Sequence, residues 1–143
     1  MTGAMIRIGA LVAATELFCA AGYCQQLTGS TGTAAGERWQ SSWLDINPPI
    51  SFKKGETLRL KLEGDAENIL VRLLPASSPP ESSDGIEGNV RKVPGSRTLE
   101  IKLEGDHPSI KQISVHAGKE AWGRPLGGNN GTIRVVSIER IKK

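Results

Sequence analysis

The segments TLRLKLEGD (residues 57–65) and TLEIKLEGD (residues 98–106) nearly repeat each other, and in both segments apolar residues alternate with charged ones. Side chains two positions apart lie on the same face of a β-strand. The apolar positions of the two copies are Leu58, Leu60 and Leu62, and Leu99, Ile101 and Leu103. A one-residue slip would expose all of them, and burying each is worth roughly 1.5 to 3 kcal/mol. The repeat therefore predicts two half-buried strands.

The length and composition of the chain limit the fold and the function. Two copies within 143 residues are too few for a β-propeller, which needs at least about four blades. With 38% hydrophobic and 23% charged residues, the chain is expected to form one globular domain. The net charge is only +3, and basic residues alternate with acidic ones. Because phosphate binding requires a concentrated basic face, we expect no nucleic-acid partner.

The N-terminus is typical of an export signal. An apolar run follows Arg7, and small residues at Ala20 and Gly22 suit cleavage there or after Cys24. We therefore expect a signal peptide over residues 1–24 and an exported protein, periplasmic or secreted. Glu16 interrupts the run, so an amphipathic helix or a misassigned start codon remain alternatives. The run is too short for a stable membrane anchor.

The segment after the apolar run is rich in Thr, Gly, Ser and Ala. This composition predicts a flexible leader over residues 25–37, followed by the folded domain over residues 38–143. Both cysteines lie at or before the expected cleavage point, so no disulfide framework is expected.

The remaining strands are expected from short apolar patterns. A first strand over residues 39–46 would end at the prolines of residues 47–49, since proline donates no hydrogen bond to a ladder. Residues 68–74 are apolar at nearly every position, which predicts a central strand covered on both faces. A short edge strand is expected around residues 86–93, within a long loop.

Two further strands are expected near the C-terminus. His107 and Pro108 would form a turn before a strand over residues 110–116, with Ile113 and Val115 pointing inward. The last strand would cover residues 132–141, and its alternation breaks at the adjacent Val135 and Val136, which indicates a β-bulge. The fold class is therefore all-β, an antiparallel β-sandwich of about eight strands.

The order of these segments resembles a known fold family. A strand ending in VRLLP (71–75) precedes RTLEIKL (97–103), QISVHAG (112–118), a Trp and Gly loop, and the closing strand IRVVSIERI (133–141). This order is similar to the galactose-binding-like jelly roll, which many carbohydrate-binding modules share. The resemblance implies a ligand face built from loops at one end or from a concave sheet, and sometimes a structural calcium. It implies no particular sugar.

The loop AGKEAWGRPLGGNNG (residues 117–131) holds most of the candidate ligand-binding residues. Trp122 offers an aromatic plane, and Arg124, Asn129 and Asn130 offer planar hydrogen-bonding groups. Sugars present C–H patches to indole faces and paired hydroxyls to such groups, so the loop predicts a glycan site. The alternative is that Trp122 packs onto the core while the asparagines adopt left-handed turns.

The sequence favours structural roles for the other candidate residues. The exception is His116, which we include among the ligand-binding residues. His116 shares the polar face of its strand with Gln112 and Ser114, and nothing in the sequence indicates a nucleophilic triad or a zinc site. Trp39 and Trp43 are expected to seal one end of the core. No cofactor or metal is expected. Asp65 and Asp106 follow glycine in matching turns at the ends of the two repeats, where they are expected to bond backbone donors. The alternative is that they ligate calcium.

The sequence thus favours an exported, noncatalytic binding module with a carbohydrate ligand. The alternative is a module for protein–protein interaction or assembly that uses an edge strand or the Pro-rich segment of residues 75–94. An enzyme is the third possibility, because the ionisable residues follow the alternation of a solvated surface.

Overall fold

The computed structural model describes residues 16–19, 22–77, 90–121 and 123–142. Every regular element within these residues is a β-strand. The strands are β1 (Glu16–Cys19), β2 (Gly22–Gln26), β3 (Gly29–Ala35), β4 (Trp39–Phe52), β5 (Thr57–Glu63), β6 (Asn68–Pro75), β7 (Arg91–Lys92), β8 (Thr98–Lys102), β9 (His107–Gly118), β10 (Glu120–Ala121), β11 (Arg124–Pro125) and β12 (Arg134–Ile141).

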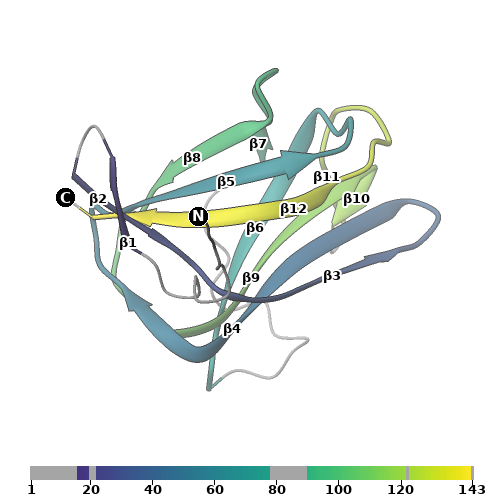
Figure 1. Cartoon of the computed structure of the whole chain (residues 1–143). Coiled ribbons are helices and arrows are strands. Elements are labelled where there is room, and N and C mark those ends of the chain that lie inside the picture. Colours follow the sequence, from purple (N-terminus) through teal and green to yellow (C-terminus); the bar gives the residue numbers. More distant parts are fainter. Residues whose placement is uncertain (1–15, 20–21, 78–89, 122, 143) are drawn as a thin grey trace, which may run out of the picture.

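The strands form two five-stranded sheets and one small hairpin. The first sheet has the order β1-β2-β12-β5-β8, and the second has the order β3-β4-β9-β6-β7. Strands β10 and β11 form the hairpin. All pairings are antiparallel, and the two sheets lie face to face (Figure 1). The predicted antiparallel β-sandwich is therefore confirmed.

The two repeat segments pair with each other at the edge of the first sheet. Leu60 on β5 lies opposite Leu99 on β8, and both side chains are buried. On the outer face, Arg59 lies opposite Glu100, and its Nε donates to Glu100 Oε2 at 2.8 Å. A second bond joins Arg59 Nη1 to Glu139 Oε1 at 3.3 Å. The predicted alternation is therefore confirmed, and the repeat supplies complementary charges to two neighbouring strands.

The core lies between the inner faces of the two sheets. Val71 on β6 is paired with Val115 on β9, and both are fully buried. Strand β6 is also covered on its outer face, where Leu70 packs against Ala121 and Leu126. The prediction of a central strand covered on both faces is confirmed. This second cluster fixes the β10–β11 hairpin region over the outer face of the second sheet.

One predicted strand end and one predicted turn are wrong. Strand β4 continues through Pro48 and Pro49 to Phe52, because the ladder with β9 shifts register between Asp45 and Ile50. No ladder partner is then needed at the prolines, which lack a donor. The pair His107 and Pro108 begins β9 rather than forming a turn, and it lies beside another register shift of the same ladder.

The predicted flexible leader is also wrong. Within residues 25–37, β3 pairs with β4 along its whole length, and Leu27 belongs to the main core. Small polar residues suit an edge strand because backbone hydrogen bonds form without large side chains. Cys24 on β2 is buried and disulfide-bonded, so the expectation of no disulfide fails there. Cleavage of residues 1–24 stays a prediction.

Several smaller features agree with the sequence. The register of β12 against β5 shifts between Val135 and Ser137, where a bulge is predicted. A short edge strand, β7, lies within the predicted range of residues 86–93, of which 86–89 lie outside the described residues. Among the residues with described placement, no helix is long and apolar enough to cross a membrane.

Candidate functional site

The outer face of the second sheet carries an aromatic and polar row. Because alternate residues of a strand share a face, Trp39, Ser41 and Trp43 of β4 point away from the core while Leu44 and Ile46 point into it. The register of the ladder then sets which residues of β9 lie beside them.

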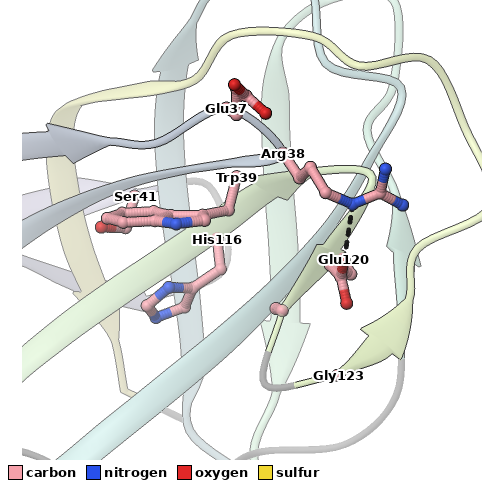
Figure 2. A pocket seen from close by; sticks show the side chains of 8 residues that line it. Glu37, Arg38, Trp39, Ser41, His116, Glu120 and Gly123 are labelled. Carbon is pink, nitrogen blue, oxygen red and sulfur yellow. Dashed lines mark hydrogen bonds and ion pairs between the residues drawn. The ribbon is translucent and has the colours of Figure 1, made fainter.

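On β9, His116 lies opposite Ser41, and Ser114 lies opposite Trp43. The row therefore crosses two adjacent strands, with aromatic rings on one strand and hydroxyl and imidazole groups available across the ladder. Figure 2 shows Trp39, Ser41 and His116 at this face.

The two indoles cover two glycines of the same chain, one on β3 and one in the turn between β3 and β4. A Cβ placed on Gly32 of β3 would lie 2.6 Å from Cζ2 of Trp43, and one on Gly36 would lie 2.4 Å from Nε1 of Trp39. Trp39 nevertheless remains 43% exposed. The expectation that the tryptophans seal the core is therefore wrong, because their strand parity directs them outward.

A hollow of about 550 Å³ opens beside Trp39. Its lining residues come from the turn before β4 and the start of β4, from β9 and from the β10–β11 hairpin (Figure 2). They are Glu37, Arg38, Trp39, Ser41, His116, Glu120, Ala121 and Gly123. The hollow thus combines one aromatic face with hydroxyl, imidazole and charged groups.

The hairpin wall is held by contacts to Arg38. The guanidinium Nε donates to Glu120 Oε2 at 2.7 Å, and the Arg38 carbonyl accepts from the amide of Lys119 at 2.7 Å. Gly118 has φ 110°, and a Cβ there would lie 2.5 Å from the Arg38 carbonyl oxygen. Only glycine permits this approach. The ion pair itself is exposed, so it fixes position more than it adds stability.

His116 is a neutral group in this site at physiological pH. Burial, and secondly the positive charge of Arg72, lower the pKa of its imidazole to about 4. Ser114 Oγ lies 2.9 Å from His116 Nε2. Arg72 is itself buried on β6, directly opposite Ser114. The site therefore offers an uncharged imidazole that can both donate and accept hydrogen bonds.

The structure divides the site residues predicted from the sequence. His116 lines the hollow. Trp122 lies outside the described residues, although its neighbours Ala121 and Gly123 line the same hollow. Arg124 is exposed on β11, one strand of the hairpin. Of the four candidates that the structure describes, His116 thus lines the hollow and Arg124 lies on the hairpin beside it.

The two asparagines do not line the hollow. Asn129 Nδ2 donates to the carbonyl of Asp65 at 2.8 Å, and its Oδ1 accepts from the amide of Glu67 at 2.9 Å. Its side-chain amide therefore ties the loop before β12 to the turn between β5 and β6. Asn130 is exposed. The sequence interpretation placed both asparagines with Trp122 because they share one loop. It missed the contact of Asn129 with the turn before β6, because a contact across a long sequence separation leaves no local pattern.

The two turn aspartates bond backbone donors, as expected. Asp65 Oδ1 accepts from the amide of Thr132 at 2.8 Å, and Asp106 Oδ1 accepts from the amide of Lys54 at 2.8 Å. The hydrogen bond from the Thr132 amide is the main cause that lowers the pKa of Asp65. Among the residues that the structure describes, no group of three or more His, Cys, Asp or Glu side chains could hold a metal ion.

Comparison with solved structures identifies similar folds, whereas the sequence comparisons find no match. No protein-family model matches the chain, and no curated protein matches it in sequence. Among solved structures, a low-affinity xylan-binding module of Roseburia intestinalis superposes with a TM-score of 0.50 at 10% identity, covering 90% of this chain and 84% of that chain. An F5/8 type C domain from Bacteroides fragilis has a TM-score of 0.45 at 13% identity, covering 80% of this chain and 74% of that chain. The resemblance to the jelly roll of carbohydrate-binding modules is confirmed at the level of the fold.

Proposed function

We propose that this protein is an exported, noncatalytic module that binds a glycan in the hollow beside Trp39. The observation that carries the proposal is an exposed indole next to neutral His116 and buried Ser41 on one sheet face. A sugar ring can place its C–H face on the indole while its hydroxyls meet imidazole and hydroxyl groups. The fold is also that of a solved xylan-binding module, which supports a carbohydrate as the ligand class.

The hairpin supplies the second part of the proposed site. Gly123 lines the hollow and Arg124 follows it on β11, so Trp122 and Arg124 would bind the ligand from the hairpin side. Asn129 is assigned to loop anchoring, because both ends of its amide are bonded within the chain. Asn130 stays a candidate on account of its exposure. Export is supported by the apolar run after Arg7.

The test is a glycan array probed with the full chain, followed by calorimetric titration of the best ligand. We expect Trp39→Ala and Trp122→Ala each to weaken binding by about tenfold or more, since loss of an aromatic platform removes about 1.4 kcal/mol or more. The Trp39 side chain points away from the core and is 43% exposed, so its removal should leave the fold intact. Calcium should not change the binding if no metal takes part.

Two matched variants separate the site from the fold. Val136→Ala removes a large exposed apolar side chain on β12 of the first sheet, and should bind as the wild type does. Asn129→Ala should lower thermal stability and leave ligand affinity unchanged. A wild-type chain that binds no glycan on the array would overturn the function. Binding that survives both tryptophan substitutions would overturn the site.

A further inference from the structure

We propose that the outer edge of β3 is a dimerisation surface, on which β3 of a second copy of this chain pairs antiparallel to form one continuous sheet. The proposal does not rest on the glycan function. Strand β3 is the last strand of the second sheet, and only its inner edge is paired with another described strand (Figure 1). Its outer edge therefore presents backbone donors and acceptors to an incoming strand.

Edge strands are normally protected against such pairing, and β7 and β8 follow this rule. β7 consists of only two residues, Arg91 and Lys92, and β8 carries the charged Glu100 and Lys102 on its outer face. Short length and charge both prevent strand addition. β3, in contrast, has seven residues, GSTGTAA, with neither charge nor proline. It keeps a continuous register with β4 from Gly29 to Ala35, without a bulge.

The sequence of β3 is complementary to itself, which points to a second copy as the occupant. A two-fold axis at Gly32 would pair Gly32 with the same residue of the second copy, and Thr31 with Thr33 of that copy. All seven residues then find partners, and each pair lies on one face. Cross-strand threonine pairs are favourable, and the absence of charge removes like-charge repulsion. Closed two-fold pairing of one patch with itself is the commonest form of association.

Among the residues that the structure describes, the surroundings of β3 leave room for this partner. A hollow of about 520 Å³ is lined by Thr33 and Ala35 of β3 and, on its other side, by Gly64, which follows β5, and Ile133, which precedes β12. In the proposed register, the small residues 29–31 of the second copy lie beside this hollow. On the outer face, the indole of Trp43 covers Gly32 and would approach its counterpart across the axis.

The proposed interface is modest in size. One seven-residue strand pair with small side chains buries less than the roughly 1,600 Å² of a standard interface. The dimer should therefore form reversibly and depend on concentration. Sedimentation velocity of the full chain over a wide concentration range should show a shift from monomer to dimer. Hydrogen exchange of the β3 amides should slow over the same range.

Charge variants at the facing threonines test the register directly. In Thr31→Lys/Thr33→Lys, each new lysine faces a lysine of the second copy, so the dissociation constant should rise by about tenfold or more. In Thr31→Lys/Thr33→Glu, lysine faces glutamate on both sides of the axis, and the dimer should persist. Val136→Lys adds positive charge on the other sheet and should have no effect.

Thr31 and Thr33 are exposed, so both double variants should keep the circular dichroism of the wild type. A wild-type chain that stays monomeric at every concentration would overturn the proposal, and capture of an unrelated strand by β3 would then be the alternative. Equal association of the two double variants would also overturn it, because the register around Gly32 requires them to differ.

Discussion

At the scale of single residues, His116 should make the stability of the fold depend on pH. The pKa of its imidazole is about 4 in the folded protein, against 6.5 ordinarily. The unfolded chain therefore binds more protons between these pH values, so the free energy of unfolding falls as the pH drops from 6.5 to 4 and levels off below. The expected loss is about 3 kcal/mol at most. Chemical denaturation at closely spaced pH values measures it.

The variant His116→Gln isolates this effect. Glutamine keeps hydrogen-bonding groups but does not titrate, so the difference between wild type and variant should contain the dependence of the imidazole alone. Arg72, which lies opposite Ser114 on β6 and whose charge also lowers the pKa of His116, stays charged throughout the window. A variant that loses stability with falling pH as steeply as the wild type would show that the imidazole is not held neutral.

Individual residues also show where sequence interpretation was limited. The outward direction of Trp39 follows from strand parity, because Leu44 and Ile46 of the same strand occupy the core. That signal was present, but the large apolar surface of tryptophan favoured a buried position. The anchoring of Asn129 to Glu67 depends on a loop contact across 62 residues, for which the sequence holds no pattern.

At the scale of elements, the strands with strict alternation were predictable because register and burial depend on the same period of two. Both repeats and the inner face of β9 agree with expectation. So does β6, whose nearly continuous apolar run predicted burial on both faces. The wrong predictions concern strands that are held by backbone pairing. β3 has no apolar alternation, and its strand conformation comes from its ladder with β4. The prolines of β4 are tolerated because a register shift removes the need for their donors.

The pairing of the two repeats leads to a comparison within β5. Leu60 is fully buried opposite Leu99, so Leu60→Ala should lower the free energy of unfolding by about 2 to 5 kcal/mol. Arg59→Ala removes half-exposed ion pairs with Glu100 and Glu139, and should cost about 1 kcal/mol or less. Urea unfolding of the two variants measures both. An equal loss would mean that the charged face contributes as much stability as the buried one.

At the scale of the whole molecule, the N-terminal strands complete both sheets. β2 pairs with the end of β12, and Gln25 accepts a hydrogen bond from Arg140 Nε at 3.0 Å. Leu27 reaches the main core, and β3 covers the edge of β4. A chain that begins at residue 38, where the sequence placed the start of the domain, would lack all of these contacts.

Truncated chains therefore test the architecture as a whole. A chain that begins at residue 25 keeps Gln25, Leu27 and β3, and should unfold at a temperature moderately below that of the full chain. A chain that begins at residue 38 should unfold more than about 10 °C lower or fail to fold, since each kcal/mol shifts the midpoint by several degrees in a domain of this size. Thermal unfolding followed by circular dichroism measures the order. Equal midpoints for the two truncations would contradict the packing of Leu27 and β3, because only the longer chain retains them.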